Sequence, residues 1–158
     1  MKTEIERKFL VVGDAWRAAA GAGELYEQGY ISSGSEKITV RVRRAADRGF
    51  LTLKGPTEGI SRSEMEYEIP AEEADFMLKN FCGGRIVSKM RYLLPFNGNT
   101  WEIDEFSGKN AGLILAEIEL ETEGQPFEKP AWIGEEVSHD PRYFNAALAL
   151  NPFLSWEV

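Results

Sequence analysis

The sequence contains very little cysteine and histidine. Cys82 is the single cysteine and His139 the single histidine among 158 residues. One cysteine excludes an intramolecular disulfide, which makes a reducing, cytoplasmic location the expectation. Cys82 is expected to be a small buried apolar residue rather than a nucleophile. His139 stands beside an expected helix start, and we give it no catalytic role.

Long apolar runs and an excess of positive charge are also absent. No run approaches the roughly 20 apolar residues of a membrane span. The opening segment MKTEIERKFL is charged throughout, unlike a signal peptide. The net charge is −8, whereas nucleic-acid-binding proteins are usually basic because counterion release from phosphates supplies much of their affinity. We therefore expect neither a membrane partner nor a nucleic-acid partner, although a local basic pocket remains compatible with the composition.

Short segments of alternating polar and apolar residues, separated by clusters of glycine and proline, dominate the chain. This pattern is typical of antiparallel strands joined by turns. The expected strands lie near 3–11, 25–31, 37–44, 50–54, 61–69, 86–93, 100–106 and 113–121. Helices are expected at 15–20, 71–80 and 141–150, the last beginning with Asp140 as N-cap and Pro141. The length predicts one domain over residues 1–158.

One face of seven of these strands is almost entirely ionisable. Splitting each strand by its period of two puts apolar residues on the opposite face. The basic positions are Lys8, Arg41, Arg43, Lys54, Arg62, Lys89 and Arg91, and the acidic positions are Glu4, Glu6, Glu64, Glu66, Glu102, Asp104, Glu117 and Glu119. A solvated sheet face also alternates in this way, but it normally includes serine, threonine, asparagine and glutamine.

The charged faces are better explained if they converge inside a barrel while helices cover the apolar faces outside. We therefore predict an α+β, mainly β, fold: an eight-stranded antiparallel closed β-barrel, or tunnel, with a charged interior and helices packed outside. Arginine suits bidentate phosphate contacts, and carboxylates are ligands for Mg²⁺ or Mn²⁺. A small triphosphate with a divalent metal satisfies both sets of charges.

The motifs resemble those of the CYTH superfamily, the triphosphate tunnel metalloenzymes. The first is Glu4-Ile5-Glu6-Arg7-Lys8, which resembles the ExExK signature of that family. In chain order, the others are Gln28-Gly29-Tyr30-Ile31, Arg41-Val42-Arg43, Leu51-Thr52-Leu53-Lys54, Arg62-Ser63-Glu64-Met65-Glu66, Lys89-Met90-Arg91-Tyr92, Glu102-Ile103-Asp104 and Ala116-Glu117-Ile118-Glu119. The resemblance implies a tunnel that acts on triphosphates with Mg²⁺ or Mn²⁺. The short, single-domain form is most similar to the inorganic tripolyphosphatases.

We assign roles by chemistry. The basic residues are expected to bind phosphates and to neutralise charge in the transition state: Lys8, Arg41, Arg43, Lys54, Arg62, Lys89 and Arg91. The expected metal ligands are Glu4, Glu6, Glu117 and Glu119. For Glu64, Glu66 and Asp104, three roles stay open: orienting basic residues, holding a second metal, or positioning the attacking water. Tyr30 is either a core residue or a tunnel-mouth residue that touches the terminal phosphate.

Other functions compete with hydrolysis of tripolyphosphate to pyrophosphate and phosphate. An adenylate cyclase on the same scaffold would need a base pocket, which the sequence does not reveal. A non-catalytic polyphosphate-binding module would gain nothing from the paired acids. Processing of RNA 5′ ends is disfavoured by the net charge. The oligomeric state stays open, with a homodimer among the options.

Overall fold

The computed structural model describes residues 1–31 and 37–156, and its framework is a single antiparallel sheet. Most of the expected strands are found within two residues of their expected bounds, since only the end of the sixth strand lies further out. In chain order the strands are β1 (Lys2–Val11), β2 (Glu24–Tyr30), β3 (Thr39–Ala45), β4 (Arg48–Lys54), β5 (Ser61–Ile69), β6 (Ile86–Phe96), β7 (Asn99–Phe106), β8 (Ile114–Glu119) and β9 (Ile133–Glu136).

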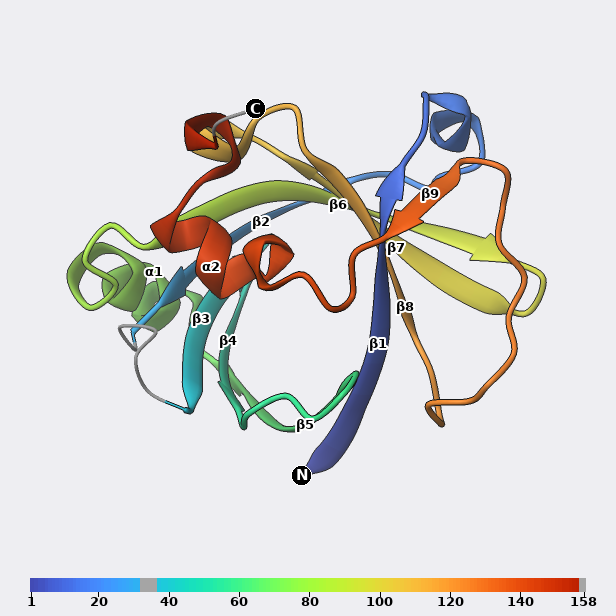
Figure 1. Ribbon diagram of the computed structural model, residues 1–158. Coiled ribbons are helices and arrows are strands. Elements are labelled where there is room, and N and C mark those ends of the chain that lie inside the picture. Colours follow the sequence, from blue (N-terminus) through green and yellow to red (C-terminus); the bar gives the residue numbers. More distant parts are fainter. Residues whose placement is uncertain (32–36, 157–158) are drawn as a thin grey trace.

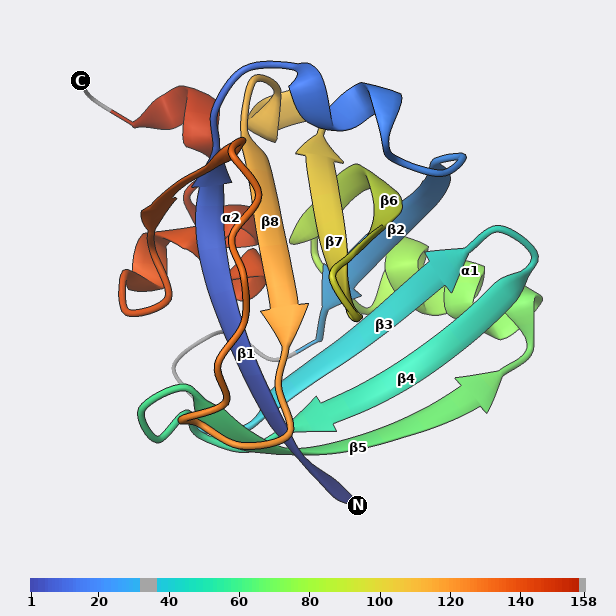
Figure 2. The same ribbon diagram turned by 90° about the vertical axis from the view of Figure 1, so that its right-hand side faces the viewer.

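The sheet closes into a ring. Its strand order is β5-β4-β3-β2-β6-β7-β8-β1-β9, and a further pairing joins β5 to β1. On one edge, β1 pairs with β5 through Lys2–Ile5 and, further along, with β9; on the other edge, Glu6–Leu10 pair with β8. Figure 1 shows the strands arranged in a ring, and Figure 2 shows β1 running past the start of β5 near the N-terminus. The prediction of an eight-stranded antiparallel barrel is confirmed, with β9 added outside the ring.

The apolar core lies on the outer side of the barrel. Phe9, Trp16, Trp101, Ile103 and Ile118 are at most 1% exposed and belong to one cluster. A second cluster packs the C-terminal segment against the sheet through Leu148, and a third packs the helix α1 (Ala71–Asn80) against β3 through Ala74 and Val42. Because side chains alternate along a strand, an outward core leaves the charged face inside. The predicted charged interior is therefore confirmed.

The helices agree with the sequence to different degrees. The helix α1 has its predicted bounds, and Glu72 and Glu73 occupy its first turn, where the helix dipole favours acids. The expected helix at 15–20 is instead a short 3₁₀ helix, Ala15–Ala18, whose Trp16 is fully buried. None of the described helices is long and apolar enough to cross a membrane.

The expected helix at 141–150 is broken in two. A 3₁₀ turn, Pro141–Tyr143, is capped by the Asp140 side chain, as predicted, and α2 (Asn145–Leu150) follows after an extended residue, Phe144. The Tyr143 carbonyl accepts a hydrogen bond from Lys8 Nζ at 3.0 Å. That contact takes up a carbonyl that an unbroken helix would use internally. The break therefore ties this segment to the charged interior of the barrel.

Candidate active site

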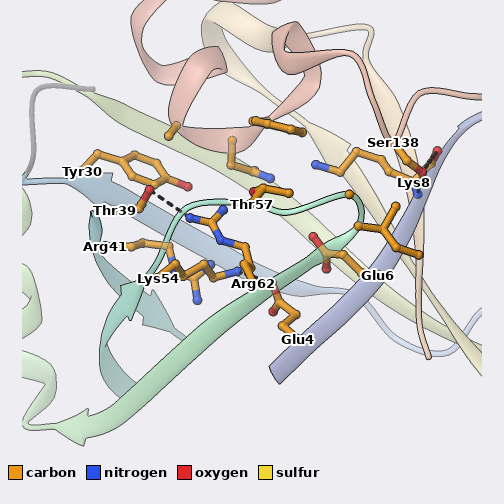
Figure 3. A pocket seen from close by; sticks show the side chains of 15 residues that line it. Glu4, Glu6, Lys8, Tyr30, Thr39, Arg41, Lys54, Thr57, Arg62 and Ser138 are labelled. Atoms are coloured by element: carbon orange, nitrogen blue, oxygen red, sulfur yellow. Dashed lines mark hydrogen bonds and ion pairs between the residues drawn. The ribbon is translucent and has the colours of Figure 1, made fainter. Parts of the chain in front are cut away.

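Two adjoining pockets occupy the interior of the barrel. Their volumes are about 190 and 160 Å³, and both are lined by Glu4, Glu6, Arg41, Lys54 and Asn145. Figure 3 shows Tyr30, Arg62 and Glu6 reaching from different strands into the first pocket. Of the residues singled out from the sequence as catalytic or metal-binding, all except Asp104 line one pocket or the other.

Asp104 lies behind the lining instead. It is fully buried on β7, where its carboxylate accepts from Lys89 Nζ at 2.7 Å and from Arg91 Nε at 2.8 Å. Burial would raise the pKa of Asp104, but Arg91 and Lys89 outweigh it and lower that pKa. Burial lowers the pKa of Lys89, while the adjacent Asp104 carboxylate opposes this and favours the charged ammonium. In this position Asp104 holds two cations in place.

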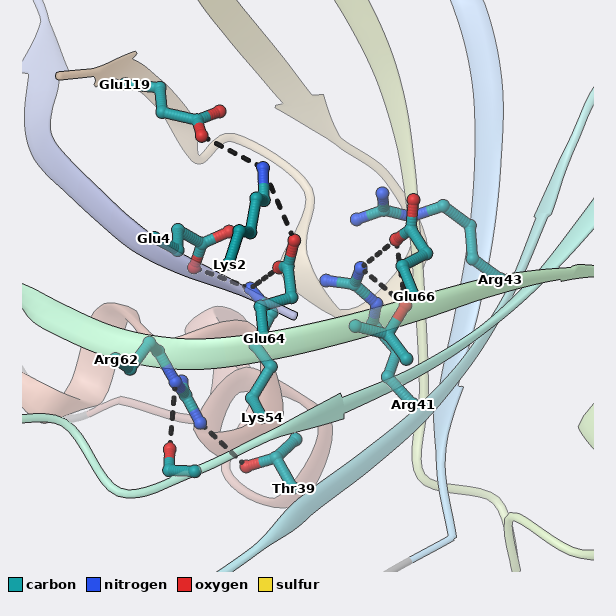
Figure 4. A network of polar contacts seen from close by, with 12 residues as sticks. Lys2, Glu4, Thr39, Arg41, Arg43, Lys54, Arg62, Glu64, Glu66 and Glu119 are labelled. Atoms are coloured by element: carbon teal, nitrogen blue, oxygen red, sulfur yellow. Dashed lines mark hydrogen bonds and ion pairs between the residues drawn. The ribbon is translucent and has the colours of Figure 1, made fainter. Parts of the chain in front are cut away.

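A second network lies at the seam between β1 and β5. Lys54 Nζ lies 2.8 Å from a Glu4 oxygen and 3.2 Å from a Glu64 oxygen. Lys2 Nζ, from the start of β1, lies 3.5 Å from Glu64 and 3.0 Å from Glu119. Figure 4 shows these contacts on one side of the interior. Three of the expected acids are thus engaged with lysines at this seam.

Three arginines are left with hydrogen-bonding capacity. Arg41 Nη2 reaches Thr52 Oγ1 at 3.2 Å and Glu66 Oε2 at 3.3 Å, while its Nε is buried with no hydrogen-bond partner in the described chain. Arg43 and Arg62 form no ion pair with any described residue. Burial, followed by repulsion from Arg41 and Arg91, lowers the pKa of Arg43 to about 10. A buried guanidinium donor without an acceptor is costly, and an anion in the pocket would satisfy it.

Glu6 is an acidic residue that lines both pockets and lacks a basic partner among the described residues. It makes no ion pair with the described residues, and burial together with Glu117 and Glu4 raises its pKa to about 8. Glu117, by contrast, faces Lys8 Nζ at 3.5 Å, and its pKa is lowered to about 2 although burial opposes this. A cation beside Glu6 would relieve the crowding of carboxylates.

The four expected metal ligands border one pocket, but they do not by themselves form a complete coordination site. No group of three or more acidic, histidine or cysteine residues within the described ranges is arranged to hold a metal ion. Mg²⁺ is usually held by one or two carboxylates together with substrate phosphates and water. The oxygen donors around Glu6 fit such a hard cation, with the remaining ligands coming from a bound phosphate chain. The four-residue ligand set stays a prediction.

Several polar residues of the site were given no role on the basis of the sequence. Gln28 is fully buried between Tyr30 and Arg43, and Asn145 Oδ1 accepts from Lys89 Nζ at 3.1 Å. Thr52 is also fully buried and donates to Glu66. A search for charged positions overlooks uncharged polar residues, although Gln28 shares its strand face with Tyr30 and could have been found in that way. Tyr30 combines both expected environments, because its ring packs in an apolar cluster while it lines the pocket.

Known proteins provide an independent comparison. The model of the CYTH domain matches residues 2–144. The chain is 51% identical to an inorganic triphosphatase of Acetivibrio thermocellus over 99% of both chains, and 41% identical to one of Nitrosomonas europaea over 94% of this chain and 98% of that one. The crystal structure of the inorganic triphosphatase NE1496 superposes with a TM-score of 0.68 at 36% identity, covering 95% of this chain and 96% of that one. A family match over most of the sequence, two relatives of nearly full length and a shared barrel lead to one conclusion: this chain belongs to the CYTH domain family.

Proposed function

We propose that this protein is a metal-dependent inorganic triphosphatase, which hydrolyses tripolyphosphate to pyrophosphate and phosphate. The observation that carries the proposal is the pairing, in one enclosed space, of Arg41, Arg43 and Arg62 with a crowded carboxylate, Glu6. A bound anion would accept hydrogen bonds from the arginines, and a bound cation would neutralise Glu6. The names of the two curated relatives support the same activity.

The basic residues differ in how closely carboxylates pair with them. Arg43 and Arg62 form no ion pair with the described residues, and Arg41 is paired with Glu66 through Nη2 alone, so all three keep donors for phosphate oxygens. Lys54, Lys89 and Arg91 are held by carboxylates, so they offer fixed positive charge along the chain of phosphates. Lys8 lies between Glu117 and the Tyr143 carbonyl, close to Glu6 along β1. Preorganised charge of this kind stabilises the transition state of phosphoryl transfer.

The acidic residues divide in a similar way. Glu64 holds Lys54, Glu66 holds Arg41, and Asp104 holds Lys89 and Arg91, which favours an orienting role over metal binding for these three. Glu6 would hold the metal, with further oxygens from Glu4, Glu117 or Glu119. A bound Mg²⁺ or Mn²⁺ would supply charge neutralisation at the phosphate oxygens. A cytoplasmic location, suggested by the single cysteine, and a small-molecule substrate complete the proposal.

One observation favours adenylate cyclase activity as a second candidate. Ile60, Phe144 and Ala146 give the first pocket an apolar side, which a nucleobase could contact. The size of the substrate that fits beside these residues decides between the two functions.

The test is phosphate release by the purified protein from tripolyphosphate, ATP and pyrophosphate, each with Mg²⁺, with Mn²⁺ and with EDTA. Metal-dependent release from tripolyphosphate well above ATP supports the proposal. Formation of cyclic AMP and pyrophosphate from ATP would establish the cyclase instead. Tight binding of tripolyphosphate in a calorimeter without turnover of any substrate would leave a polyphosphate-binding module as the function.

A further inference from the structure

Gln28 connects two residues of the first and second pockets without lining either. It lies on β2 with no exposed surface, on the inward face of the barrel. Its Nε2 lies 2.8 Å from Tyr30 Oη, and its Oε1 accepts from Arg43 Nε at 3.0 Å. The register explains the second contact, because Gln28 stands directly opposite Arg43 on β3.

The chemistry of the three groups allows only one arrangement of these hydrogen bonds. A guanidinium Nε–H can donate but never accept, so the Gln28 group that faces Arg43 must be the amide oxygen. The amide NH₂ then faces Tyr30, and an NH₂ group only donates. Tyr30 Oη is therefore the acceptor in this pair. The opposite orientation of the Gln28 amide is excluded, because it would place its NH₂ group against the Nε–H of Arg43.

This arrangement fixes the direction of the Tyr30 hydroxyl hydrogen. A phenolic oxygen carries one hydrogen, and the lone pair that faces Gln28 is already in use. The hydrogen must therefore point elsewhere. Tyr30 lines the first pocket together with Arg41 and Arg62, and Figure 3 shows its hydroxyl on the same side as these two groups. An oxyanion in that pocket is the natural acceptor.

We propose that Gln28 is a positioning residue that locks the Tyr30 hydroxyl as a hydrogen-bond donor to a phosphoryl oxygen of the substrate. The inference deepens the proposed function and rests on it for the identity of the acceptor. Arg43 determines the direction of both hydrogen bonds. Its Nε–H can only donate, which orients the Gln28 amide, and the amide in turn orients the Tyr30 hydroxyl. Tyr30 then accepts a hydrogen bond from Gln28 and donates one to the substrate.

The substitution Gln28→Glu isolates the direction of this hydrogen bond. The new carboxylate keeps the shape of the side chain and the bond from Arg43, but it can only accept from Tyr30. The hydroxyl would then turn away from the substrate. The carboxylate also adds a charge beside Arg43, so the single variant alone is not decisive. A cycle with Tyr30→Phe separates the two effects, because the charge acts in both backgrounds and the reversed hydrogen bond acts only when Tyr30 is present.

The experiment measures kcat/KM for tripolyphosphate with Mg²⁺ in the parent protein, Gln28→Glu, Tyr30→Phe and the double variant. A lost hydrogen bond to a charged group should make Tyr30→Phe about tenfold to a hundredfold slower. The factor lost through Gln28→Glu should be at least about fivefold smaller in the Tyr30→Phe background than in the parent. Equal factors in both backgrounds, or no loss through Gln28→Glu, would overturn the inference.

Two further measurements keep the outcome unambiguous. Thermal melts report whether each variant folds, and Gln28→Met, which removes both hydrogen bonds without adding charge, replaces Gln28→Glu if that protein does not fold. Its loss should likewise shrink when Tyr30 is absent, and an unchanged factor counts against the inference. If the parent protein releases no phosphate, the proposed function fails, and the same cycle measured on the Kd for tripolyphosphate with Mg²⁺ still tests Gln28.

Discussion

Lys89 Nζ donates to Asp104 at 2.7 Å, and neither side chain is more than 1% exposed. Arg91 shares the same carboxylate through two hydrogen bonds of 2.8 Å. A buried carboxylate shared by two cations adds little to the stability of the fold, because the penalty of removing the charges from water offsets much of their attraction. The arrangement makes better sense as a way to fix two positive charges beside a binding space.

Asp104→Asn should therefore destabilise the protein severely. The substitution keeps the shape of the side chain but leaves Lys89 and Arg91 with no shared counter-charge. Breaking a buried pair in this way costs about 3–5 kcal/mol. Urea unfolding checks the value, and Glu105→Gln is the matched control on the same strand. Glu105 pairs with Arg17 at the surface, so its loss should cost less than about 1 kcal/mol. Similar losses in both variants would contradict the special role of Asp104.

Arg41→Ala should abolish most of the turnover while the barrel survives. Arg41 has a buried Nε without a partner among the described residues, and its side chain lines both pockets. Removing a preorganised donor of this kind costs about a hundredfold to a thousandfold in kcat. Phosphate release from tripolyphosphate measures the effect. Arg44→Ala is the control, because Arg44 lies on the same strand but pairs with Asp75 outside the barrel. Near-normal turnover in a folded Arg41→Ala protein would remove Arg41 from the site.

Glu6 should make the metal-free protein less stable as the pH rises. Its pKa in the folded protein, about 8, lies above the ordinary 4.5 of the unfolded chain. Between these values the folded state binds more protons, so stability is fully present below pH 4.5 and is lost as the pH rises toward 8. Each unit of pKa difference corresponds to about 1.4 kcal/mol. In EDTA, the melting temperature should therefore fall from pH 5 to pH 7, and less so in Glu6→Gln.

The control for this pH series is Glu68→Gln. Hydrogen bonding to Arg48 lowers the pKa of Glu68, so any contribution of that group lies below pH 4.5. Its melting temperature should follow the parent protein between pH 5 and pH 7. A Glu6→Gln protein with the same slope as the parent would contradict the crowding of carboxylates around Glu6.

Gly29→Ala should destabilise the barrel through its outer face. A Cβ at this position would lie 2.6 Å from Cys82 Sγ and 2.7 Å from Ile86 Cδ1. Overpacking of a tight core costs about 1–3 kcal/mol. Denaturant unfolding measures the loss, and Cys82→Ala in the same protein should restore part of it. Gly124→Ala, where nothing lies within 4 Å of the added atom, should differ from the parent by less than about 0.5 kcal/mol. An unchanged midpoint in Gly29→Ala would show that Cys82 and Ile86 do not pack tightly against β2 at this position.

The sequence predicts the barrel well because two constraints agree along each strand. A period of two separates the charged face of β3, with Arg41 and Arg43, from the buried Val42, and the same division on seven strands favours charged faces that converge inside a closed sheet. The short strand β9 was not predicted, since four residues with a glycine among them give too weak a signal. The break at Phe144 was missed because it depends on a contact with distant Lys8.

The site was predictable to the extent that its residues carry charge. Some charged residues line the pocket, and others hold the residues that line it. The difference depends on how deeply each side chain is buried in the barrel, which strand alternation does not report. Asp104 and Glu102 alternate alike on β7, yet only Glu102 lines a pocket. Gln28 and Asn145 hold other side chains through uncharged amides, and no pattern of charge distinguishes them from ordinary polar residues.

The topology of β1 has a consequence for the way the protein folds. Most neighbours in the ring are joined as consecutive strands, but β1 lies between β5 and β8, which follow it by tens of residues. Closing such long loops is entropically slow, so we expect β1 to dock after the local hairpins have formed. The strand that arrives last carries Glu4, Glu6 and Lys8. Completing the barrel and bringing together the charges that it encloses are then one kinetic event, and a nascent chain with an open seam has no site.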